Sequence, residues 1–105
     1  MIRRRRRFHD LVERQLDLFE EDEAGLLSEA DEADSAWTNA DASEAEELYG
    51  DYQLVVDAIG ESLYDIRESF ARSIDESTAR EYRIEFNRAV ESRFGRYATF
   101  VDGDL

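Results

Sequence analysis

One run of apolar residues in the middle of this proline-free chain most narrows the folds open to it. These residues are Ala45, Leu48, Tyr52, Val55, Ile59, Leu63, Ile66, Phe70 and Ile74. They recur at alternating steps of three and four, which places them on a single stripe of an α-helix. Because proline would interrupt such a helix and the chain has none, the pattern predicts one helix over about 43–74. Ser43 with Glu46, or Asp41 with Glu44, has the spacing of a capping box at its start.

A second helix is predicted over about 78–100. Its aromatic residues recur at helical spacing and are expected in the core: Tyr82, Phe86, Phe94, Tyr97 and Phe100. Thr78 and Glu81 match the capping-box spacing, 75–77 is a short connector, and 102–104 is the exit from the helix.

The remaining helix is predicted over about 4–33, with an apolar face about half its circumference wide. Such a face suits a helix that packs between two neighbours. Gly25 lies inside this helix and costs about 1 kcal/mol relative to alanine, so it is the expected position of any break. Residues 34–42 form an acidic connector. The chain is therefore expected to fold as a single all-α domain over 1–105, a bundle of three long antiparallel helices, and three thin rods with one modest core favour a homo-oligomer.

Charge is distributed in blocks along the chain. The 105 residues carry 27 acidic and 13 basic side chains, a net charge of -14, and every basic residue is arginine. Residues 1–7 form a basic N-terminal arm, 8–66 hold 19 acids and one arginine, and 67–105 are nearly balanced. The acidic middle should repel nucleic acids and anionic membranes. The lysine-free composition is typical of a high-GC genome and leaves an actinobacterium and a salt-adapted archaeon as alternative sources.

The residue types leave little room for catalysis. There is no cysteine, only one histidine and no glycine-rich phosphate loop, which excludes thiolate metal sites and a thiol nucleophile. Residues 8–14 do not form the apolar core of a signal peptide, and no run is long enough to span a membrane. We therefore expect a cytoplasmic protein without enzymatic activity, cofactor or metal.

Two charged segments could bind partners. The basic segment, which could contact phosphates through its guanidinium groups, consists of Arg3, Arg4, Arg5, Arg6 and Arg7. Its alternative role is to balance the acidic middle as a solvated helix start. Residues 20–47 hold twelve carboxylates and no cation, so they could imitate the phosphates of DNA and occupy a basic protein, or simply be solvated.

The most specific string is the pentapeptide Gln15, Leu16, Asp17, Leu18 and Phe19. It resembles the bacterial sliding-clamp-binding motif, Gln-Leu-Ser/Asp-Leu-Phe, with which DNA polymerases and mismatch-repair proteins dock on the clamp. The resemblance covers five residues and implies that Gln15 hydrogen-bonds at the rim of a pocket that Leu18 and Phe19 fill. The helical pattern leaves another possibility, in which Phe19 faces the core of the bundle.

Function is therefore expected to rest on contact with proteins, including a second copy of the chain. A replication or repair accessory that docks on the sliding clamp through Gln15–Phe19 is the first alternative. The second is an acidic DNA-mimic inhibitor of a basic protein.

Overall fold

The computed structural model describes residues 7–95, which form four helices and no strand. The helices are α1 (His9–Asp22), α2 (Ala24–Thr38), α3 (Ala45–Ala71) and α4 (Glu76–Arg93). The predicted all-α class is confirmed, although the expected three helices are four. The expected features at 1–6 and 96–105, among them Arg3–Arg6, Tyr97, Phe100 and the exit at 102–104, lie outside the described residues.

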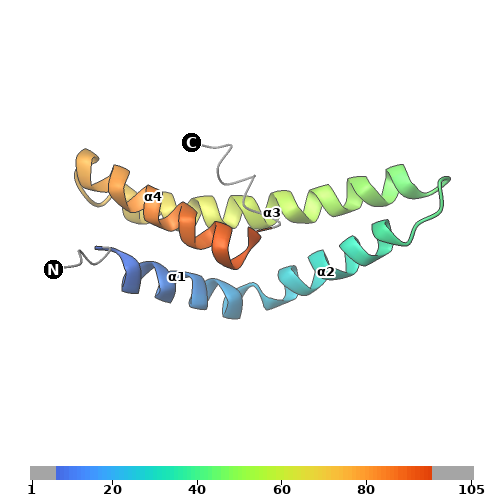
Figure 1. Ribbon diagram of the computed structural model, residues 1–105, viewed down its shortest axis with the longest axis horizontal. Helices are drawn as coiled ribbons and strands as arrows, with labels where there is room; N and C mark the ends of the chain where they lie inside the picture. The colour runs from blue at the N-terminus through green and yellow to red at the C-terminus, as the bar shows by residue number, and fades with distance from the viewer. Residues whose placement is uncertain (1–6, 96–105) are drawn as a thin grey trace, which may run out of the picture.

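The helices divide the molecule into two parts of different thickness. In Figure 1, α1 and α2 follow one another along one side, α3 runs back beside both of them, and α4 returns beside α3 at the α1 end. In agreement, α2 packs on α3, and α4 packs on α1 and α3. We call α1, α4 and the C-terminal half of α3 the three-helix lobe. We call α2, the loop after it and residues 45–58 of α3 the two-helix lobe.

The core lies mainly in the three-helix lobe. Its largest buried apolar and aromatic side chains come from all three helices and are Val12, Leu16, Phe19, Ile59, Leu63, Tyr82, Phe86 and Val90. Phe8, just before α1, packs edge-on against Tyr82 with ring centroids 5.4 Å apart. Aromatic pairs in this geometry add about 0.5–1.5 kcal/mol beyond the burial of their area. Packing against two partners thus explains the broad apolar face of α1.

The first predicted helix is broken, and the break is at Glu23 rather than at Gly25. Four consecutive acids, 20–23, end α1, where the helix dipole disfavours negative charge. The same charges are favourable at the start of a new helix. Backbone hydrogen bonds still join Glu23 N to Phe19 O and Leu27 N to Glu23 O, at 2.8 and 2.9 Å, so the break is a bend rather than a loop.

The predicted connector at 34–42 is wrong, because α2 continues to Thr38 and the loop is 39–44. Aromatic packing accounts for the extra turn. The ring of Trp37 lies 5.0 Å from that of Tyr49 and stacks on that of Tyr52 at 6.3 Å. These contacts between α2 and α3 hold the last turn of α2.

The capping boxes predicted for both helices are also wrong. The N-cap of α3 is Glu44, without a side-chain hydrogen bond, and neither Ser43 nor Asp41 supplies one. α4 begins earlier than predicted, and its cap is Asp75, whose carboxylate accepts from Thr78 N at 2.8 Å and from Thr78 Oγ1 at 2.9 Å. At its other end α4 stops at Arg93, before residue 100, and Phe94 folds onto Phe19 with ring centroids 5.4 Å apart.

Candidate protein-binding surface

The two-helix lobe has no third helix beside it among residues 7–95, and apolar side chains are exposed there. Leu54 on α3 is 70% exposed, and Trp37 and Tyr49 are each about two-fifths exposed. Sequence reasoning missed Leu54 because this residue lies off the apolar stripe of its helix. An apolar residue off the stripe of an amphipathic helix is the signal that could have found it.

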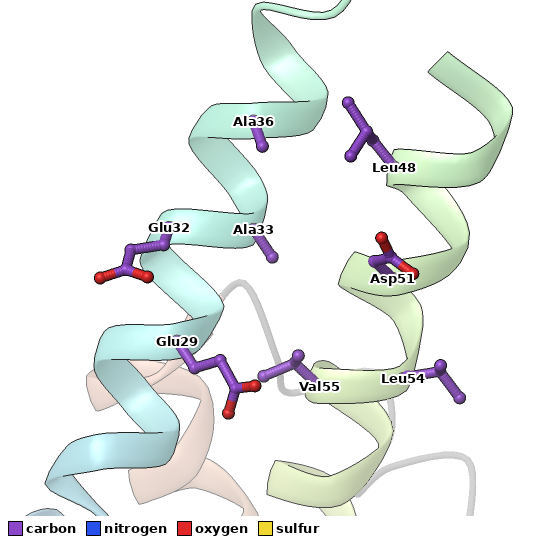
Figure 2. Close-up of a pocket in the computed structure, with 8 residues that line it drawn as sticks. All are labelled: Glu29, Glu32, Ala33, Ala36, Leu48, Asp51, Leu54 and Val55. Carbon is purple, nitrogen blue, oxygen red and sulfur yellow. The ribbon is translucent and has the colours of Figure 1, made fainter. Parts of the chain in front are cut away.

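A groove of about 470 Å³ runs between α2 and α3 in this lobe. Figure 2 shows Ala33 and Ala36 on α2 facing Leu48 and Val55 on α3, while Leu54 points away from the gap as one shoulder of the groove. The groove exists because α2 presents methyl groups where α3 presents larger side chains. Its floor is therefore apolar.

The rim of the groove is acidic. Glu29 and Glu32 on α2 and Asp51 on α3 line it. Figure 2 shows Glu29 reaching toward the apolar floor, whereas the Glu32 carboxylate points away from α3 on the outer edge of the rim. The sequence has no lysine or arginine between Arg14 and Arg67, so the whole lobe is without a cation of its own. Carboxylates around an apolar floor create a negative potential that selects positively charged groups.

The pentapeptide lies within α1 and helps to attach that helix to the core. Leu16 and Phe19 are buried in the core, and Gln15 Oε1 accepts a hydrogen bond from the Tyr82 hydroxyl at 2.9 Å. Asp17 binds Arg93 at 2.8 Å. The two anchors that the resemblance assigns to one pocket point apart, because Leu18 is 48% exposed while Phe19 is in the core. Docking on a clamp through this string thus requires α1 to leave the bundle.

A second, smaller cavity adjoins the pentapeptide. It measures about 340 Å³ and is lined by Gln15, Leu18 and Phe19 of α1 together with Ser62 and Ile66 of α3, among others. Of the basic segment 3–7, only Arg7 lies within the described residues. Its guanidinium is 3.7 Å from the Glu81 carboxylate. That ion pair agrees with charge balance within the protein. The other four arginines lie outside the described residues.

A buried ionic cluster joins α3 to α4, and the sequence did not reveal it. Arg67 is 1% exposed and donates to Glu68 at 2.8 Å and to Asn87 at 3.0 Å. Arg83 binds both oxygens of the Glu68 carboxylate, at 2.9 and 3.0 Å. These bonds, that of Arg83 first, outweigh burial and lower the pKa of Glu68 to about 2.

The ions of this cluster are paired with one another, which is the arrangement in which buried charges are tolerated in a fold. Within residues 7–95, no buried side-chain nitrogen or oxygen is left without a hydrogen bond. No group of three or more histidine, aspartate or glutamate residues in that range could hold a metal ion. The helical spacing 56, 60, 63, 67 and 71, which the buried positions of α3 follow, is the signal that could have placed Arg67 inward.

Among the described helices, none is long and apolar enough to cross a membrane. Comparison of the chain with known protein families, with curated proteins and with solved structures gives no match.

Proposed function

We propose that the protein acts without catalysis, by binding a protein partner that has a basic surface, and that the two-helix lobe is its binding surface. The observation that supports this proposal is the apolar groove with an acidic rim in a lobe without cations. Exposed apolar surface framed by polar residues is typical of protein interaction sites. The sign of the charge then selects the kind of partner.

A basic partner suits this surface better than a second copy of the chain. Two copies that met through their two-helix lobes would bring together two surfaces that both lack cations. Coulomb repulsion opposes that contact at low ionic strength, and salt screens the repulsion. Self-association through this face should therefore strengthen with salt, whereas binding of a basic partner should weaken.

A DNA-binding protein is one class of partner that fits the proposal. Carboxylates within 20–47 are carried on the end of α1, on α2 and on the start of α3, so the helices hold them in defined positions. In that case the protein would inhibit DNA binding by its partner, and duplex DNA would compete with it.

Photo-crosslinking from a single site tests the proposal. A photoreactive phenylalanine analogue replaces Leu54 in cells that produce the protein, and the matched control carries it at Ile84, which is 47% exposed on α4 in the three-helix lobe. We expect the position 54 probe to form an adduct with a different, basic protein, and the yield to fall as salt is raised in the lysate. The position 84 probe should not form this adduct.

The outcomes separate the alternatives. An adduct at position 54 that joins two copies of this chain would contradict a basic partner and would show that this surface forms a homo-oligomer. Equal yields at positions 54 and 84, or no adduct at position 54, would contradict the proposal.

A further inference from the structure

The three-helix lobe shows what a third helix does for this fold. There, α4 places Phe86 and Val90 against the inward faces of α1 and α3, and both side chains are completely buried. Side chains of a third helix fill the groove between two antiparallel helices in this way. In the two-helix lobe, Leu48 and Val55 also point into a groove, but no described helix fills it.

We propose that this groove receives an amphipathic helix of the partner protein, with an apolar stripe flanked by arginine or lysine. This inference rests on the proposed function and specifies the partner's chemistry. The two helices and the incoming one would together complete a second three-helix bundle. The protein would thus bind by supplying two helices of a three-helix unit.

The dimensions of the groove specify the incoming stripe. Its lining extends from Glu29 to Ala36 along α2 and from Leu48 to Val55 along α3. Either stretch corresponds to about two helical turns, roughly 10 Å at 1.5 Å per residue. A partner helix would therefore present apolar residues at i, i+3 or i+4, and i+7, the spacing with which helices fill grooves.

Charge complementarity specifies the flanks. Glu29 and Glu32 stand on the α2 side of the groove and Asp51 on the α3 side. A helix seated between them would have carboxylates on both sides, so cations on both flanks of its apolar stripe would form ion pairs. Acidic helices, nucleic acids and anionic lipid surfaces would be repelled by the same carboxylates.

The test uses the whole protein and three synthetic peptides of equal length. The first is a helix with a leucine stripe between arginine flanks, the second has the same composition in an order without a stripe, and the third has glutamate in place of arginine. Binding is measured by calorimetry and by the fluorescence of Trp37, the one tryptophan of the chain, which follows Ala36 of the groove. We expect micromolar binding of the striped basic peptide with a change in Trp37 emission, binding at least about tenfold weaker for the scrambled peptide, and none for the acidic one.

Two matched triple variants locate the site. One neutralises the rim, Glu29→Gln, Glu32→Gln and Asp51→Asn; the other removes the same charge from the exposed face of α3, Asp57→Asn, Glu61→Gln and Asp65→Asn. The rim variant should weaken binding roughly tenfold or more and the α3-face variant less than about threefold, because ion pairs act over short range at physiological salt. Circular dichroism verifies that both variants keep their helices.

Equal binding of the striped and scrambled peptides would overturn the inference, because it would show that the surface attracts any positively charged peptide through its charge alone. Equal losses in the two triple variants, or no binding of the striped peptide, would also overturn it. The crosslink from position 54 separates this failure from failure of the proposed function. If that adduct with a basic protein persists while the striped peptide fails, a basic partner binds in another form than a helix.

Discussion

At the scale of single residues, the most consequential arrangement is the ionic cluster of Arg67, Glu68 and Arg83. Burying a charge is unfavourable unless partners replace its water. Arg67 meets that condition with Glu68 and Asn87, and its guanidinium lies 5.1 Å from the centre of the Tyr64 ring. Glu68 binds arginines from both helices, which couples α3 to α4 at a defined register.

Acid should weaken the fold through Glu68. Its pKa is lowered from 4.5 to about 2, so its contribution is complete above pH 4.5 and is lost as pH falls through its folded pKa. This loss amounts to about 3 kcal/mol between pH 5 and pH 2. Glu68→Gln has no titratable group at this position, so it should remove the loss from the difference between the unfolding free energies at the two pH values. Urea unfolding at both pH values measures the effect, with Glu61→Gln on the exposed face as control. An unchanged pH dependence in Glu68→Gln would show that the cluster contributes nothing to acid sensitivity.

The burial of the Tyr82 hydroxyl predicts a loss of stability in alkali. Burial raises the pKa of Tyr82 from 10.0 to about 12, so the folded state holds this proton more tightly than the unfolded state. Its contribution is present below pH 10 and is lost as pH rises toward 12. Tyr82→Phe should remove a loss of about 2 kcal/mol between pH 9.5 and 11.5, as measured by chemical unfolding at the two pH values. Identical alkaline losses in both proteins would refute this role.

At the scale of helices, Asp75 starts α4 and Ser43 does not start α3, although both lie near predicted capping boxes. Asp75→Ala should lower the free energy of unfolding by about 1 kcal/mol, because Thr78 N loses its acceptor. Ser43→Ala should change it by less than about 0.5 kcal/mol, as expected for an exposed residue without such a contact. Thermal unfolding of both variants measures the contrast. A larger loss of unfolding free energy for Ser43→Ala than for Asp75→Ala would show that Ser43 does cap α3, as the sequence predicts.

The clamp hypothesis stays a prediction, and the fold adds a condition to it. Arg93 ties α1 to α4 through Glu13 and Asp17, so Arg93→Ala should raise the population in which α1 is released. If the pentapeptide docks on a bacterial sliding clamp, that variant should bind a few-fold more tightly than the parent, because affinity scales with the competent population. Gln15→Ala should abolish binding in both backgrounds. Calorimetric titration against the clamp measures the affinities, and tighter binding by the parent than by Arg93→Ala would contradict the coupling to α1 release.

At the scale of the whole molecule, charge and packing are unevenly distributed. The core lies where three helices meet, whereas the two-helix lobe has fewer buried side chains and no cation. The described residues thus combine a packed end with an end that leaves apolar surface exposed to solvent. We interpret this division as the basis of the proposed binding.

Salt should stabilise the folded protein. Between about 0.01 and 0.15 M ionic strength the Debye length falls from about 30 to 8 Å, which screens repulsion among the carboxylates. The melting temperature should therefore rise over that range, and the rise should be smaller in the variant Asp57→Asn, Glu61→Gln and Asp65→Asn, which lacks a row of neighbouring charges. Calorimetric melts at the two ionic strengths test this. A melting temperature that falls with salt would show that attractive ion pairs, such as those of Arg93, outweigh the repulsion.

Much of the architecture follows from local pattern. The step of three and four residues along α3 sufficed to predict a long helix, since the period of apolar residues reflects helical geometry directly. Asp57, Glu61 and Asp65 lie opposite the stripe and are exposed for the same reason. The tract without lysine or arginine between Arg14 and Arg67, which includes the rim of the groove, can also be seen in the sequence.

Other features depended on contacts between segments far apart in the sequence. Trp37 extends α2 because Tyr49 and Tyr52 are present across the loop. Arg67 turns inward because Asn87 of α4 accepts its hydrogen bond and because Arg83 of α4 holds the neighbouring Glu68. The groove exists only because the alanines of α2 face Leu48 and Val55, a pairing that the register of two helices decides. Periodicity in the sequence indicates which face of a helix is apolar. Which helix covers that face, and which apolar face stays uncovered, are decided by packing in three dimensions.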